Sequence, residues 1–178
     1  PVGEGAAAVI VASADAIARL GIDLERAVTV RSSTLRTEEV TLEVGMGDAE
    51  LTRKTTAQAF EESSVDPADL DIVEMHDAFS IEELLYLEAM DICPVGEATQ
   101  ALRGGEFDIG GRCAVSPSGG LLFMGHPLGP TGVGQICEIT RQLREEAGIR
   151  QHPNARIGLA HMVGIGSVCA VHILSKDK

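Results

Sequence analysis

The chain has 178 residues, of which 44% are hydrophobic and 23% charged, so it is long and apolar enough for one globular domain. Its formal net charge of −13 disfavours nucleic acids and anionic membranes as partners, because both carry charge of the same sign. The longest apolar run near the start is about seven residues, which predicts neither a signal peptide nor a membrane span. The cysteines are Cys93, Cys113, Cys137 and Cys169. They form no CxxC pair, which argues against a metal site and favours reduced thiols in a cytoplasmic protein.

The first half of the chain alternates between predicted strands and helices. An apolar run over 6–12 has the pattern of a buried strand, and the helix after it has Ser13 as N-cap and Gly21 as its stop. A strand is expected over 27–35 and a helix over 48–63 with Asp48 as N-cap. Since a strand stands at the very start, we expect further sequence before it, in a parent protein or a partner subunit.

The second half continues the alternation around a loop-rich stretch. A short buried strand is predicted over 72–75, a helix over 80–90, glycine-rich loops over 91–125, a long helix over 129–147, and strands over 155–161 and 167–174. Gly164 and Gly166 indicate a tight hairpin between the last two strands. The fold class is therefore α/β, a layered αβα domain with a mixed five-stranded sheet covered by helices on both faces.

Three histidines stand in or beside predicted loops and form the candidate site. His126 lies between Gly125 and Pro127, after a glycine-rich loop that contains Ser118 and before the long helix. His76 and His161 fall at the ends of predicted strands. A histidine between glycine backbone and a helix N-terminus is well placed to move a proton, so we expect the three loops to converge on one site.

Structural explanations remain open for each feature by itself. A single histidine at a strand end is usually a hydrogen-bonded structural residue, and we expect this for His152 and His172. The glycine-rich loop over 116–125 can be only a tight connection. The joint pattern of three loop histidines beside glycine or helix-capping residues favours the functional interpretation.

The motifs around these histidines resemble those of thiolases. Ser116-Pro117-Ser118-Gly119-Gly120 followed by the Gly125–Gly132 stretch is similar to the NPSGG…GHPLGATG signature of that family. His76-Asp77-Ala78-Phe79 resembles the His-Asp-Cys-Phe motif of the sterol-carrier-protein-x and archaeal types. His161-Met162-Val163-Gly164 resembles their His-Asn-x-Gly loop. The resemblance makes 1–178 a thiolase C-terminal domain without the half that carries the nucleophilic cysteine.

The resemblance implies an acyltransferase of lipid metabolism that makes or cleaves a carbon–carbon bond beside a thioester. Coenzyme A would be a substrate, with no bound cofactor and no metal. His126 would activate the cysteine of the other half and help hold the thioester oxygen, while His76 would orient an oxyanion donor. His161 would stand near a second oxyanion site. The remaining binding residues implied are Gly125, Gly164, Gly166 and Ser118.

The departures from the family pattern leave alternatives open. Ala78 and His161 occupy the places where relatives carry an acid/base thiol, and Met162 replaces the usual asparagine. The isolated chain is expected to be inactive. The parent could instead be a retro-aldolase acting on β-hydroxyacyl-coenzyme A, or the chain a non-catalytic assembly subunit. The partners implied by resemblance are the N-terminal thiolase half, further copies in a dimer or larger homo-oligomer, and a small zinc-containing protein.

Overall fold

The computed structural model describes residues 3–37, 47–164 and 167–176. Its helices are α1 (Ala14–Leu20), α2 (Gly47–Ser63), α3 (Ser80–Ala89), α4 (Ala98–Arg103), α5 (Gly120–Met124) and α6 (Thr131–Leu143). Its strands are β1 (Thr29–Thr37), β2 (Ile72–Glu74), β3 (Ala114–Val115), β4 (Ile157–Gly164) and β5 (Val168–Ser175). Single 3₁₀ turns lie at Leu24–Arg26, Pro67–Asp69 and Gly148–Arg150.

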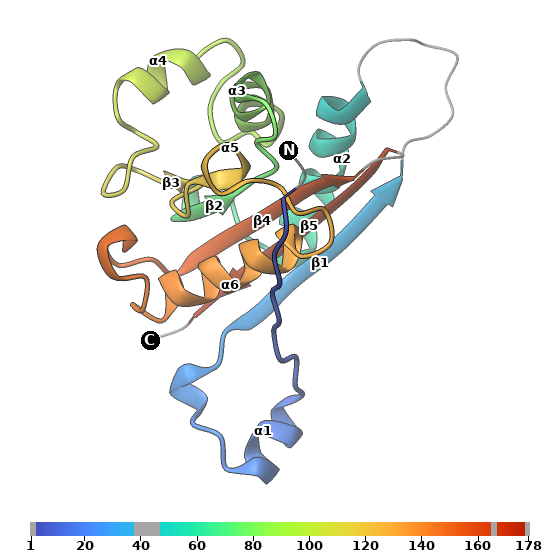
Figure 1. Ribbon diagram of the computed structural model, residues 1–178, viewed down its shortest axis with the longest axis vertical. Helices are drawn as coiled ribbons and strands as arrows, with labels where there is room; N and C mark the ends of the chain where they lie inside the picture. Colours follow the sequence, from blue (N-terminus) through green and yellow to red (C-terminus); the bar gives the residue numbers. More distant parts are fainter. Residues whose placement is uncertain (1–2, 38–46, 165–166, 177–178) are drawn as a thin grey trace.

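The strands form one mixed five-stranded sheet in the order β1-β5-β4-β2-β3 (Figure 1). The strands β4, β2 and β3 run parallel, whereas β5 is antiparallel to both β4 and β1. The predicted fold class is therefore confirmed, including the antiparallel pair of strands at the end of the chain. Parallel neighbours end at the same edge of a sheet, so the segments that follow β2, β3 and β4 meet there.

Helices cover both faces of the sheet and enclose two apolar clusters. The larger cluster joins α2, α3 and α4 to one face; it includes Leu51, Ala59, Val73, Met75, Tyr86, Leu87, Leu159, Val171 and Ile173. The smaller cluster joins α6 to the other face; it includes Ile72, Ala114, Ile139, Leu143, Ala160 and Leu174. Successive strand residues, such as Ile72 and Val73, thus face opposite layers, as the alternation of a β-strand requires.

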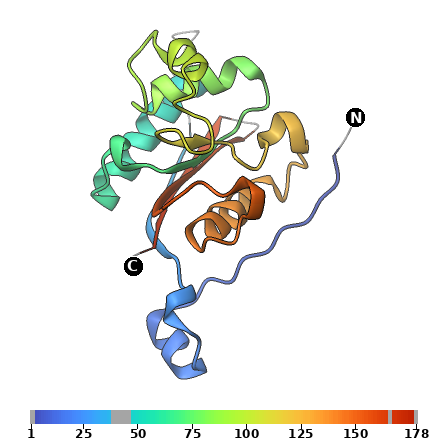
Figure 2. The same cartoon turned by 90° about the vertical axis from the view of Figure 1, so that its left-hand side faces the viewer.

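The predicted strand over 6–12 is wrong. This segment forms no helix or strand, and Ile10 and Val11 are 94% and 84% exposed. Figure 2 shows it as an extended chain along the outside of the molecule, leading to α1, which projects from the body. The carbonyl of Ala8 accepts a hydrogen bond from the Cys137 thiol on α6, with 3.5 Å between the two atoms. A buried-strand pattern needs a neighbouring strand, and the described part of this chain supplies none.

The fifth strand is instead β3, which lies inside the stretch predicted to be loops. Only two residues long, β3 has no periodicity that a sequence pattern can reveal, and the same stretch also holds α4 and α5. The long helix predicted over 129–147 is shorter, Thr131–Leu143, because Pro130 precedes its first turn and Glu145 has a positive φ of 60°. Ser13 and Gly21 cap α1 as predicted, the latter in the left-handed conformation.

The contact between β4 and α6 depends on a glycine. A Cβ atom at Gly158 would lie 2.5 Å from the Cγ2 atom of Ile139, whose side chain is fully buried. Gly134, one turn into α6, has no heavy atom within 4 Å of such a position. A side chain at position 158 would therefore clash with Ile139, whereas a side chain at position 134 would change only the conformational preference of the helix.

We expect Gly158→Ala to lower the free energy of unfolding by about 1–3 kcal/mol, because α6 must shift away from the sheet. Gly134→Ala should raise it by roughly 0.5–1 kcal/mol, because alanine is the better helix former. Urea denaturation of both variants and the unmodified protein gives the comparison. Equal stability of the two variants would contradict this account of the packing.

Candidate active site

The carboxyl ends of β2, β3 and β4 bring the candidate residues to one edge of the sheet. His76 and Asp77 follow β2, the glycine-rich loop with Ser118 follows β3, and His161 is part of β4. In the topology these segments thus share one edge of the sheet. Their detailed positions differ from the sequence-based picture, most clearly at His161.

Two carboxylates at the end of β2 hold the glycine-rich loop. Glu74 accepts hydrogen bonds from the N–H of Ser118 at 3.0 Å and from its hydroxyl at 2.7 Å. Asp77 accepts the N–H of Leu121 at 2.7 Å, in the first turn of α5. A Cβ atom at Gly120 would overlap the Asp77 carboxylate, so only glycine allows this approach. The hydroxyl of Ser118 also accepts the N–H of Gly120 and is therefore committed to the loop.

Burial raises the pKa of both carboxylates. The Glu74 side chain is almost entirely buried, and burial raises its pKa to about 7 despite the two hydrogen bonds from Ser118. Burial also raises the pKa of Asp77, while the N–H of Leu121 opposes that shift. The loop is therefore held by one carboxyl group that carries a proton part of the time near neutral pH.

His126 is presented on a sharp turn between α5 and α6. Gly125 ends α5 with a φ of 84°, a conformation that favours glycine. Nδ1 of His126 lies 2.9 Å from the hydroxyl of Thr131, and that hydroxyl donates its only proton to the carbonyl of Pro127 at 2.6 Å. Since Thr131 can then only accept from the ring, the proton of His126 resides on Nδ1. Nε2 keeps its lone pair and is the nitrogen free to act as a base.

His76 packs edge-to-face against His126. The ring centroids lie 5.1 Å apart with an interplanar angle of 83°. His76 is buried, and its Nδ1 lies 3.6 Å from a carboxylate oxygen of Glu82. Burial lowers the pKa of His76, and the charge of Glu82 partly offsets that shift. The two rings form an imidazole pair that can face one small reacting group.

His161 does not stand in a loop, which corrects the sequence-based expectation. It is the fifth residue of β4, is fully buried and faces the layer of α2 and α3. Its Nδ1 accepts the N–H of His76 at 3.5 Å, its Nε2 lies 2.9 Å from the hydroxyl of Thr52, and Tyr86 packs against its ring at 4.9 Å between centroids. Burial lowers its pKa to about 3, so the ring is neutral with both nitrogens engaged inside the protein.

Alternation along β4 explains the difference. Met162 follows His161 and therefore faces the layer of α6, where a Cβ atom at Gly132 would meet the Met162 side chain at 3.9 Å. Gly132 directly follows Thr131, the residue that orients His126. Position 162 thus lies on the His126 side of the sheet. Gly164 is the last residue of β4, and Gly166 lies outside the described residues.

The cysteines are free, and Cys93, Cys113 and Cys169 are buried. Burial raises the pKa of Cys113 to about 12 and that of Cys169 to about 11, which keeps both thiols protonated. The remaining histidines are structural, as expected. His152 accepts the N–H of Gly110 at 3.2 Å, and His172 lies 3.0 Å from the hydroxyl of Ser33.

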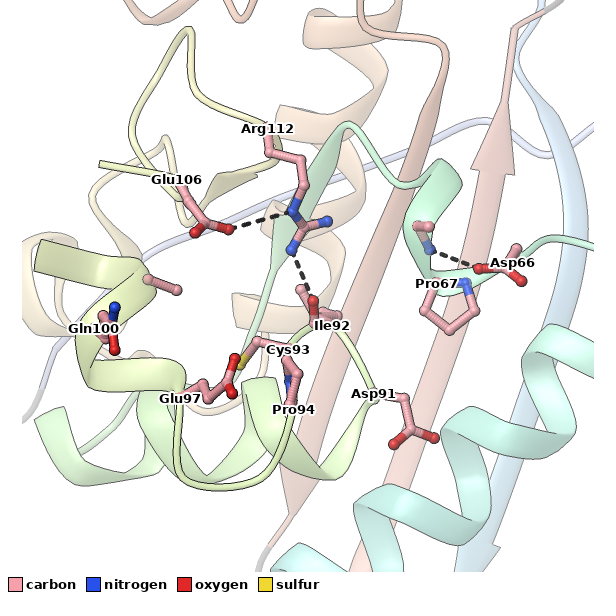
Figure 3. A pocket seen from close by; sticks show the side chains of 12 residues that line it. Asp66, Pro67, Asp91, Ile92, Cys93, Pro94, Glu97, Gln100, Glu106 and Arg112 are labelled. Atoms are coloured by element: carbon pink, nitrogen blue, oxygen red, sulfur yellow. Dashed lines mark hydrogen bonds and ion pairs between the residues drawn. The ribbon is translucent and has the colours of Figure 1, made fainter. Parts of the chain in front are cut away.

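A cavity of about 520 Å³ lies apart from this site, among Asp66, Asp91, Cys93, Glu97 and Arg112 (Figure 3). Arg112 donates to the carbonyl of Ile92 at 2.7 Å and pairs with Glu106. No histidine lines the cavity.

Across 3–37, 47–164 and 167–176, no three His, Cys, Asp or Glu side chains are grouped so as to hold a metal ion, and no helix is long and apolar enough to cross a membrane.

The neutral state of His161 has a consequence for stability. Its pKa is about 3 in the folded protein against 6.5 in the reference state, so its contribution is complete above pH 6.5 and is lost as pH falls toward 3. In His161→Gln, the decline of the unfolding free energy between about pH 6 and pH 4 should become shallower by up to about 1.4 kcal/mol per pH unit. Urea denaturation across this range tests it, and an unchanged slope would mean that His161 is not held neutral.

Glu74 should act in the opposite direction. Its folded pKa of about 7 exceeds the reference value of 4.5, so its contribution is complete below pH 4.5 and is lost as pH rises through 7. Relative to the unmodified protein, Glu74→Gln should become more stable by a few kcal/mol between about pH 5 and pH 8. Glu61→Gln, at an exposed position of α2, is the matched control in the same denaturation series. A stability difference independent of pH would contradict the assignment.

Comparison with known proteins adds the family. A family model described as "Thiolase C-terminal domain-like" matches residues 36–176. Sterol carrier protein 2 of Rattus norvegicus is 37% identical over 178 residues, covering 96% of this chain and 32% of the relative. Acetyl-CoA acetyltransferase of Methanothermobacter thermautotrophicus is 40% identical over 181 residues, covering 99% of this chain and 46% of the relative.

A solved structure, the Ltp2-ChsH2(DUF35) aldolase, shares the fold with a TM-score of 0.70 over 85% of this chain and 40% of that chain, at 21% identity. The chain thus spans less than half the length of each of these proteins. The family model covers most of the chain, including all five strands from within β1 to the end of β5. The chain belongs to the thiolase family, within the part described as its C-terminal domain.

Proposed function

We propose that the chain is the C-terminal half of a thiolase-like acyl-CoA acyltransferase, which makes or cleaves a carbon–carbon bond next to a thioester. The observation that carries this proposal is His126, whose Nδ1 proton is fixed by Thr131 and whose Nε2 remains free beside His76. A base in this state can take the proton of a cysteine thiol supplied by the N-terminal half. In the same position, its protonated form can then donate to the thioester oxygen.

The other site residues divide into groups that contact substrate and groups that support them. The backbone around Gly125, Gly164 and Gly166 would stabilise negative charge on the thioester oxygen, and His76 would add to this once its ring is protonated. His161 would act as a positioning residue, because its Nδ1 accepts the backbone N–H of His76. Coenzyme A would be a substrate of this reaction, and the reaction would need no bound cofactor.

Two exposed apolar regions support an N-terminal half as partner. On α5 and the turn after it, the exposed fractions are 53% for Leu122, 88% for Phe123, 65% for Met124 and 67% for Leu128. The second region is the extended segment over 6–12, which carries apolar side chains without a neighbouring strand. Contiguous exposed apolar surface of this kind usually marks an interface. Isolated 1–178 should therefore show no thiolysis until that half is supplied.

By resemblance, the complete enzyme would form homo-oligomers, and a small zinc-containing protein would be a further partner. The free cysteines favour the reducing cytoplasm as its compartment.

A retro-aldolase is the second candidate, and the alanine at position 78 in place of a thiol favours it. Ala78 stands where the sterol-carrier type has a cysteine, and burial keeps the Cys169 thiol protonated. Retro-aldol cleavage of a β-hydroxyacyl thioester needs a base and an oxyanion site but no acyl-enzyme. Free coenzyme A distinguishes the reactions, because thiolysis consumes it and retro-aldol cleavage proceeds without it. A non-catalytic assembly subunit would turn over neither substrate.

In the complete enzyme, His126→Asn should slow acylation of the nucleophilic cysteine by roughly 10²-fold or more, the usual scale for a positioned acid/base group. His172→Asn is the matched control, since the ring of His172 hydrogen-bonds to the hydroxyl of Ser33 and takes no part in the proposed chemistry. Rapid-quench measurement of acyl-enzyme, with thermal melts alongside, checks the result. Acylation at the normal rate in folded His126→Asn would remove His126 from the proposed mechanism.

A further inference from the structure

The buried imidazole of His76 has a carboxylate beside it that the roles described so far leave unused. Nδ1 of His76 lies 3.6 Å from Oε2 of Glu82, and the exposed side-chain fractions are 11% and 18%. The same nitrogen is buried without a hydrogen-bond partner among the described residues. At 3.6 Å the contact is electrostatic and too long for a hydrogen bond. A small movement of either side chain on substrate binding would bring the two atoms to hydrogen-bond distance.

Glu82 is held toward His76 by the start of α3. It is the third residue of that helix, and its Oε2 accepts the N–H of Phe79 at 3.2 Å. A carboxylate in the first helical turn is favoured by the unpaired N–H groups and the helix dipole. The capping contact therefore fixes the carboxylate beside the ring, at a position set by the backbone and not by the substrate.

An ionised carboxylate can only accept hydrogen bonds. It therefore favours the form of His76 that carries its proton on Nδ1. Nε2 then keeps the lone pair. We propose that Glu82 is a positioning residue that fixes this tautomer, so that Nε2 of His76 receives the proton from the α-carbon of the acyl thioester. This inference rests on the proposed function, because it names the acid/base group of the same site.

The proton step balances with groups already present. The α-carbon–hydrogen bond breaks, its electron pair moves toward the thioester carbonyl, and an enolate forms with the charge on oxygen. The proton passes to Nε2 of His76, and the resulting imidazolium is paired with Glu82. The reverse step returns the proton to carbon. Ala78, two residues after His76, stands where relatives carry a thiol, so the pair supplies the function that the missing thiol leaves open.

Several charged groups face His76, and their effects have known directions. Burial lowers its pKa most strongly, and a positive charge on His126 lowers it further. Glu82 on α3 raises the pKa, followed by smaller effects of the same sign from Asp77 and from Asp48 on α2. Removing the Glu82 charge alone should therefore lower the pKa of His76 while the other groups stay in place.

Glu82→Gln in the complete enzyme is the direct test, because glutamine can still accept the Phe79 N–H and keep the helix cap. Exchange of the α-protons of acetyl-CoA in deuterated water should slow by about 10- to 100-fold, less than the loss of the base itself. The acid-side limb of the pH profile should move to lower pH. Glu83→Gln, in the same helical turn, should stay within about twofold of the unmodified enzyme.

A ¹³C-histidine NMR titration of the same proteins gives a readout that needs no turnover, with His76→Gln used to assign the signal. Glu82→Gln should lower the pKa of His76, and Glu83→Gln should leave it in place. An unmodified enzyme that exchanges no α-protons would overturn the proposed function, while the titration would still test the Glu82–His76 pair. If folded Glu82→Gln keeps both the pH profile and the His76 titration, the inference is wrong.

Discussion

The two carboxylates at the end of β2 are the constraint on which the rest of the site depends. Glu74 and Asp77 bind backbone N–H groups of a loop that lies more than 40 positions along the chain, at Ser118 and Leu121. His76 lies between the two carboxylates, so its backbone is fixed by the same contacts. The loop leads through α5 to His126, and its anchorage sets where that ring meets His76.

Two further residues support the two histidine rings that are assigned to the chemistry of the site. His161, neutral and closed in by Thr52 and Tyr86, offers no nitrogen to a substrate but accepts the N–H that precedes the His76 side chain. Thr131 similarly donates its hydroxyl proton to the carbonyl of Pro127, which leaves the ring proton of His126 on Nδ1. His76 and His126 thus each have the backbone or the protonation of the ring set by a second residue. Such second contacts commonly fix the tautomer of a working histidine.

The sequence predicts the local elements well and the long-range contacts poorly. Ser13 and Gly21 identify α1 because capping is a local interaction, and the Gly125–Pro127 turn is visible for the same reason. His161 is predicted at the end of a strand over 155–161, beside the hairpin loop, yet β4 continues to Gly164 and alternation then places position 161 inside. Glu74 has no motif of its own and reads as an ordinary strand residue, since its partner Ser118 is distant in sequence. A signal for Glu82 existed in the first-turn acids of α3, but their helix-dipole role gave no reason to single it out.

The failed strand prediction and the chemistry of the site have the same physical origin. A run such as 6–12 has the composition of a strand covered on both faces, and a strand without a neighbour leaves its N–H and C=O groups to water. Likewise, an imidazole pair on an edge flanked by exposed Phe123 and Leu128 sits at the boundary of an apolar surface. Covering that surface would remove water from His76 and His126 and strengthen every charge interaction there, including the one with Glu82. Because burial opposes a positive charge on His76, a fixed carboxylate matters most once water is excluded, since Glu82 then favours the protonated form of the ring against the effect of burial.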